Sequence, residues 1–210
     1  MEICNENCTE ITFVGVLLWC IIPYLMCHAT YTTRSRKEWF YLWHGVCNTV
    51  LFMFSIGFIR EYGLSETESK SYIPVIVENH TRMLLMFVGE VYWCLNIGQY
   101  SLATQHHLPA LLFWWVGLSR APFELGLFFL REGQTIPVII LNTIPKLMGK
   151  SVPDVRIHIS LRILFMLIVR FPLSMHFIGN CVRLWEYAFM AFIVAYDTHI
   201  ITQMIKKIFN

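Results

Sequence analysis

The chain has 210 residues, of which 56% are hydrophobic and only 14% are charged. A soluble domain carries about 25% charged residues, so this composition excludes an ordinary soluble globule and a disordered chain. The formal net charge of +2, from 16 basic and 14 acidic residues, excludes a basic nucleic-acid-binding protein.

Apolar stretches follow one another along the chain and predict an all-α, polytopic membrane helix bundle, since a spanning helix needs about 20 mostly apolar residues. We expect about seven transmembrane helices, at 11–29, 39–59, 83–104, 107–119, 122–145, 157–179 and 184–203. Pro172 is expected to kink the helix at 157–179, because proline removes a backbone hydrogen bond. Residues 11–207 then form a single transmembrane domain between an exported segment, 1–10, and a cytosolic C-terminal tip, 208–210.

The basic residues between these helices predict the orientation of the bundle. One side carries eight bases, namely Arg34, Arg36, Lys37, Lys146, Lys150, Arg156, Lys206 and Lys207. The other side carries five, namely Arg60, Lys70, Arg82, Arg120 and Arg183. Because the more basic side faces the cytosol, we expect an exported N-terminus and a cytosolic C-terminus. Two glycosylation sequons, at Asn7 and Asn79, both fall on the predicted exported side.

Ionisable residues inside apolar helices are the first functional signal, because each costs about 2.5–3.5 kcal/mol at the bilayer centre. They are His44, Glu90, His106, His107, Glu124, Arg131, Glu132, Arg162, Arg170, His176, Asp197 and His199. Asp197 and His199 are expected to reach the membrane surface. Buried bases need carboxylate partners, for which Glu90, Glu124 and Glu132 are available. A structural ion-pair network and a catalytic one remain alternatives.

Histidines supply the second signal. His44 and Asn48 are four residues apart and share one helix face. His106 and His107 are adjacent, so on a regular helix they point about 100° apart and do not chelate one metal ion. We therefore expect no metal site. The pair is either a pair of interfacial histidines or a general base with its supporting residue.

Short motifs in a fixed order resemble those of a known membrane family. The motifs are Arg36-Lys37-Glu38-Trp39, Trp43-His44-Gly45, Gly89-Glu90-Val91-Tyr92-Trp93, His106-His107, Arg131-Glu132-Gly133-Gln134-Thr135-Ile136-Pro137 and Arg170. In this order they are similar to the TLC-domain family, which contains the ceramide synthases and the translocating-chain-associating membrane proteins. The resemblance covers about residues 11–207 and is greatest to the small members of the TLC domain-containing protein five type.

The resemblance implies a six-helix core around a cavity, in the endoplasmic reticulum or another internal membrane rather than the plasma membrane. In ceramide synthases, paired histidines serve acyl transfer from acyl-CoA to a sphingoid amine. His106 and His107 match that pair, and His44 matches an early histidine of the small members. The residues expected to bind lipid or to line the cavity are His44, Asn48, Glu90, Cys94, Glu132, Arg162 and Arg170.

Two departures from the family pattern bear on catalysis. Cys94 stands where the family often has an acid, and the acid is Glu90 instead. Gly133 likewise holds an expected acidic position, with Glu132 beside it. The leading hypothesis is therefore a multipass protein of TLC-domain type that binds membrane lipids or regulates their composition without a cofactor. The alternative is a ceramide-synthase-like acyltransferase that uses acyl-CoA and the histidine pair, and a channel or receptor is the third hypothesis.

Overall fold

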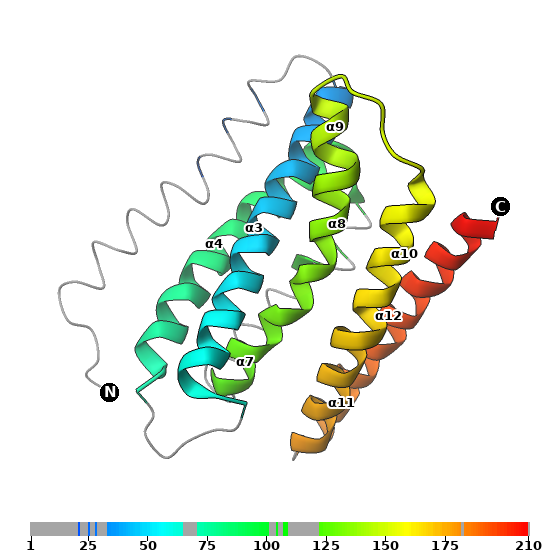
Figure 1. Cartoon of the computed structure of the whole chain (residues 1–210). Coiled ribbons are helices and arrows are strands. Elements are labelled where there is room, and N and C mark those ends of the chain that lie inside the picture. The colour runs from blue at the N-terminus through cyan, green and yellow to red at the C-terminus, as the bar shows by residue number, and fades with distance from the viewer. Residues whose placement is uncertain are drawn as a thin grey trace. The chain divides into compact units, whose positions relative to one another are not determined.

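A computed structural model describes residues 21, 25, 28, 33–64, 71–100, 104, 107–108, 122–181 and 183–209. Every secondary-structure element within these ranges is a helix (Figure 1), as the apolar stretches predict. Three helical stretches are long and apolar enough to cross a membrane, namely Lys37–Tyr62, Val155–Asn180 and Leu184–Phe209. These are the properties of an integral membrane protein. The predicted helices at 11–29 and 107–119, and the segment 1–10, lie almost wholly outside the described residues, so the count of seven stays a prediction.

The chain divides into two compact units. The first consists of Met1–Cys47 and Phe58–Leu127, and the second of Asn48–Gly57 and Phe128–Asn210. Helix α3 (Thr33–Tyr62) contributes both of its ends to the first unit and its middle to the second.

Helix α4 (Ile73–Asn96) belongs to the first unit. Pro74 lies in its first turn, where its missing N–H costs no helical hydrogen bond. The helix ends before Gly98, which has a φ of 72°. There Gln99 N–H donates to the carbonyl of Cys94, and Gly98 N–H donates to that of Leu95, in a Schellman motif. The boundaries predicted for this helix, 83–104, are therefore wrong at both ends.

Aromatic rings fill one part of the first unit. Phe58 contacts Tyr72 and Phe123, with ring centroids 6.1 Å and 5.3 Å away, and all three side chains are buried. Gly126 of α7 (Pro122–Phe128) packs directly on the Phe58 ring and on Ile76. A β-carbon at Gly126 would lie 2.7 Å from Phe58, so only glycine permits this close approach.

Residues 122–147 are helical throughout, which confirms the long and irregular helix predicted at 122–145. After α7 come a 3₁₀ segment η3 (Phe129–Thr135), α8 (Ile136–Val138), a π-helical segment η4 (Ile139–Thr143) and α9 (Ile144–Leu147). Pro137 and Pro145 have no N–H to donate, so the hydrogen-bond pattern changes near them. The run ends at Gly149, which has a φ of 66°.

The second unit continues with a long helical run and a final helix. The run consists of α10 (Val155–Phe165), the π-helical segment η5 (Met166–Arg170) and α11 (Phe171–Asn180). The irregular segment η5 lies immediately before Pro172, where the sequence predicts a kink. Helix α12 (Leu184–Phe209) lies along α10 and α11 (Figure 1). Ile159 of α10, Met166 of η5 and Met204 of α12 form an apolar core between the run and the final helix.

Candidate functional site

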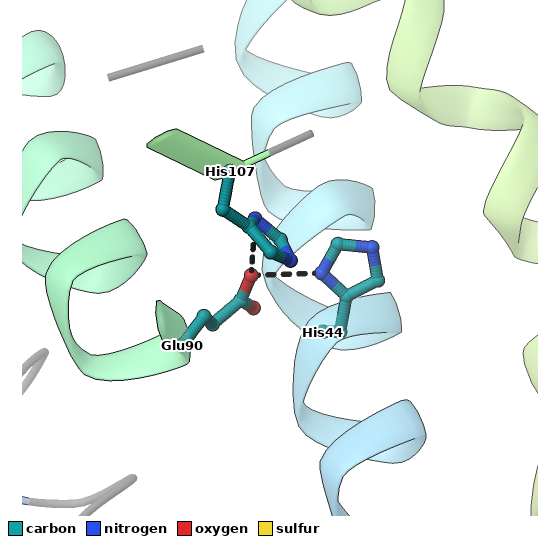
Figure 2. A group of neighbouring side chains, drawn as sticks. All are labelled: His44, Glu90 and His107. Carbon is teal, nitrogen blue, oxygen red and sulfur yellow. Dashed lines mark hydrogen bonds and ion pairs between the residues drawn. The ribbon is translucent and has the colours of Figure 1, made fainter. Parts of the chain in front are cut away.

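Two histidines of the first unit, His44 and His107, converge on the carboxylate of Glu90, as Figure 2 shows. His44 Nδ1 lies 2.9 Å from Glu90 Oε2, within hydrogen-bond distance. His107 Nδ1 lies 3.6 Å from the same oxygen. The two imidazole rings contact each other edge to face, with centroids 5.5 Å apart and planes at 86°. We call these three residues the His–Glu–His centre.

Helical spacing places an aromatic ring beside each histidine of the centre. Phe40 precedes His44 by one turn of α3, and the two rings stack with centroids 5.8 Å apart. Phe87 precedes Glu90 by about one turn of α4, and its ring lies 5.0 Å from that of His107. These rings limit the directions in which the imidazoles can turn.

The centre is almost fully enclosed. The side chains of Glu90 and His107 are 0% exposed, whereas that of His44 is 18% exposed. Among the described residues, no donor forms a hydrogen bond with the second carboxylate oxygen, Glu90 Oε1. His44 is therefore the least buried of the three members of the centre.

A carboxylate beside an imidazole has a definite chemical effect. When Nδ1–H of His44 donates to Glu90, the imidazole is held in the tautomer whose Nε2 lone pair is available to accept a proton. The carboxylate also stabilises the imidazolium that forms after proton transfer. The centre can thus act as an oriented general base, and its three ligand atoms, all within 4.8 Å of one another, can also hold a metal ion.

Other predicted site residues lie near the centre in sequence. Cys94 follows Glu90 by one turn of α4 and is buried against Phe40, Trp93 and Ile97. It is a free cysteine in an apolar cluster. Asn48 follows His44 by one turn of α3 and is also buried, but it belongs to the second unit.

The second unit has its own buried polar cluster. Arg131 of η3 donates to Asp197 of α12 and to Ser174 of α11. Arg170 Nη2 lies 3.1 Å from the other Asp197 oxygen, Oδ1. Arg131 also lies over the ring of Phe128, 5.0 Å from its centroid. We call Arg131, Arg170, Ser174 and Asp197 the arginine–aspartate network.

This network corrects two expectations. Asp197 is 1% exposed rather than at the surface, because two guanidinium groups compensate its charge inside the protein. Among the described residues, the carboxylate that pairs with Arg131 and Arg170 is Asp197, which was not among the predicted partners Glu90, Glu124 and Glu132. His199, two residues further along α12, is exposed, and its place at the membrane surface stays a prediction.

The remaining predicted residues are dispersed. Arg162 is half-buried, and its Nε donates to Gln134 Oε1 at 3.3 Å. Glu132 is half-buried in η3, and both residues belong to the second unit. His106, Asn7 and the side chain of Asn79 lie outside the described residues.

Sequence reasoning paired His107 with its neighbour His106 and did not predict its approach to His44 and Glu90. His44 and Glu90 are 46 residues apart and belong to different helices. The only signal in the sequence was that all three are ionisable residues in apolar stretches. Comparison of the chain with family models, with curated proteins and with solved structures gives no match.

Proposed function

We propose that the chain is an integral membrane protein that transfers an acyl group to a lipid, with the His–Glu–His centre as its reactive site. The observation that carries the proposal is the placement of Glu90 Oε2 against Nδ1 of His44 and Nδ1 of His107 in an enclosed interior. The resemblance to the TLC-domain family supports acyl-CoA as the donor and a sphingoid amine as the acceptor.

In this proposal His44 is the general base. In the tautomer that donates Nδ1–H to Glu90, Nε2 carries the lone pair, and the His44 side chain is the least buried of the three members of the centre. The acceptor amine attacks the thioester carbonyl carbon, a C–N bond forms and the C–S bond breaks. Nε2 takes the proton from the amine nitrogen and returns it to the leaving thiolate, so the products are an amide and a free thiol.

The other two members act through His44. Glu90 is a positioning residue, because it selects the tautomer and stabilises the imidazolium. His107 is enclosed, contacts the His44 ring edge to face and lies 3.6 Å from the shared carboxylate oxygen. It therefore restrains both the ring of His44 and the carboxylate of Glu90.

The test is acyl transfer by the purified full chain in liposomes, with palmitoyl-CoA and sphingosine as substrates and mass spectrometry of the amide product. General base catalysis contributes about 10²–10⁴-fold, so His44→Ala lowers kcat by at least about 100-fold. Glu90→Gln lowers kcat while leaving KM nearly unchanged, because Glu90 does not touch substrate. His199→Ala, an exposed histidine of α12, is the matched control and retains full turnover. Absence of turnover in the unaltered chain, or full turnover in His44→Ala, refutes the proposal.

A second candidate is the binding of membrane lipid without catalysis. The complete burial of Glu90 and His107 weighs against catalysis, since two of three members of the centre are closed to reactants, and the resemblance to the TLC-domain family supports lipid as the ligand. It predicts that one lipid class co-purifies with the chain in about equimolar amount, measured by mass spectrometry of the extract. Recovery of the bulk bilayer composition alone refutes it.

The proposed placement is an internal membrane, such as the endoplasmic reticulum, with the N-terminus lumenal and the C-terminus cytosolic. Lys206 and Lys207 are exposed in the last turn of α12, where bases favour the cytosolic side. The test is glycosylation at Asn7. In the Asn79→Gln variant, enzymatic removal of glycans increases the mobility of the chain on a gel. In the Asn7→Gln, Asn79→Gln double variant, the same treatment leaves the mobility unchanged. Modification of a sequon added after residue 210 instead contradicts the orientation.

A further inference from the structure

Two imidazoles and a carboxylate that converge in an apolar interior also make a ligand set for a metal ion. We propose that His44, Glu90 and His107 bind one divalent first-row transition-metal ion of the Zn²⁺ type. Each side chain offers one ligand atom, and these atoms all lie within 4.8 Å of one another. Two histidines and one glutamate with a fourth position open are a ligand set that zinc accepts in proteins.

The separations of the ligand atoms suit such an ion. A tetrahedral ion with bonds of about 2.0–2.1 Å holds its ligand atoms about 3.3–3.4 Å apart. Glu90 Oε2 lies 2.9 Å from His44 Nδ1 and 3.6 Å from His107 Nδ1. These two separations lie on either side of the required one, and the third, between the ligand atoms of the two imidazoles, is at most 4.8 Å, so an ion would require adjustment of the imidazoles as well as of Glu90.

The charge and burial of Glu90 supply an independent argument. Its side chain is 0% exposed, and among the described residues no hydrogen-bond donor reaches Oε1. A buried carboxylate is costly unless its charge and its lone pairs are compensated. A divalent cation compensates the charge, and Oε1 remains available as an additional oxygen ligand.

Adjacent histidines do not predict this site. The sequence predicts no metal site from His106 and His107, because these neighbours point about 100° apart on a regular helix. The ligand set in the structure instead draws one residue each from α3, α4 and the segment at 107–108. Figure 2 shows the two rings facing the carboxylate from different directions, as separate ligands of one ion would.

Metal binding would also control the proposed general base. A neutral imidazole carries its proton on one ring nitrogen and its lone pair on the other. A metal ion at Nδ1 of His44 leaves the proton on Nε2, so Nε2 no longer accepts a proton from the acceptor amine. The metal-bound form is therefore inactive in acyl transfer. This consequence rests on the proposed function, whereas metal binding itself does not.

The experiment measures binding directly on the full chain, purified in detergent and treated with a chelator. Zn²⁺ is titrated and quantified by mass spectrometry after equilibrium dialysis, and Co²⁺ absorption reports the geometry of the ligand field. We expect one ion per chain and an intense visible Co²⁺ band typical of a tetrahedral site. His44→Ala, Glu90→Gln and His107→Ala each lower Zn²⁺ affinity by more than about 100-fold, since loss of even an outer partner costs about 10–100-fold.

The controls separate a specific site from adventitious binding. His199→Ala removes an exposed histidine of α12 and binds Zn²⁺ like the unaltered chain. Glu90→Asp keeps the carboxylate, so it binds Zn²⁺ more tightly than Glu90→Gln even if both variants are less stable. Less than half an equivalent of Zn²⁺ at saturation, or equal affinities of Glu90→Gln and the unaltered chain, overturns the metal site. If acyl transfer is not inhibited when one Zn²⁺ is bound per chain, the metal site stands, and only the proposal that the metal inactivates the His44 base is overturned.

Discussion

We expect removal of Asp197 to destabilise the second unit strongly. Its carboxylate pairs with the guanidinium groups of Arg131 and Arg170, and the three side chains are 2%, 0% and 7% exposed. Asp197→Ala leaves two buried cations without the carboxylate that pairs with both. Removal of one partner of a buried ion pair costs about 3–5 kcal/mol. We expect the upper end of that range, because this carboxylate compensates two charges.

A second variant, Arg170→Met, removes one of the two cations instead of the shared anion. Arg170→Met leaves Arg131 and Asp197 as a one-to-one pair, so it removes one charge-assisted contact worth about 1.5–3 kcal/mol. The order of destabilisation is therefore Asp197→Ala first and Arg170→Met second. His199→Ala is the matched control on the same helix, because its side chain is exposed, and it changes stability by less than about 0.5 kcal/mol.

The assay is reversible unfolding of the purified chain in mixed micelles with increasing dodecyl sulfate, which yields the free energy of unfolding for each variant. A loss below about 1 kcal/mol for Asp197→Ala, or a larger loss for Arg170→Met, would refute the reasoning. Either result would mean that the network is not the charge-compensated cluster described above.

Three further variants, two of them with a control variant, test local features by the same unfolding measurement. Gly126→Ala places a β-carbon 2.7 Å from the Phe58 ring and should cost about 1–3 kcal/mol, so an unchanged midpoint contradicts the packing. Gly98→Ala strains a backbone with a φ of 72° and should cost about 1 kcal/mol, whereas Gly179→Ala, in a helix with open space, should not destabilise. Asp154→Ala removes the side chain that caps α10 and should cost about 0.5–2 kcal/mol, while Asp154→Ser should restore most of it.

Apolar patterning predicted the all-helical class of the described residues, because a spanning helix must be apolar over its whole length. The final helix, predicted at 184–203, extends over Leu184–Phe209. The C-terminal boundary of the third predicted helix was wrong for a local reason. Gly98 adopts a left-handed conformation and stops α4, whereas its composition alone allowed the helix to continue.

The polar clusters were less predictable, because partners come from distant parts of the chain. Asp197 lies 66 residues from Arg131, and nothing in its own neighbourhood indicates burial. Because Asp197 lies near the end of the helix predicted at 184–203, the sequence suggested that its side chain reaches the membrane surface. Glu90 and His44 were each identified as candidates, but only the packing of α3 on α4 places Glu90 Oε2 beside His44 Nδ1.

The central claim is that His44 and Glu90 act as one unit, and a double-mutant cycle of acyl-transfer rates tests it most directly. The rates of His44→Ala, Glu90→Gln and the double variant are compared with that of the unaltered chain. Residues that act as a unit have strongly non-additive effects, and the 2.9 Å contact joins these two side chains. The account predicts that the double variant is no slower than His44→Ala alone. Two single effects that multiply in the double variant would contradict it.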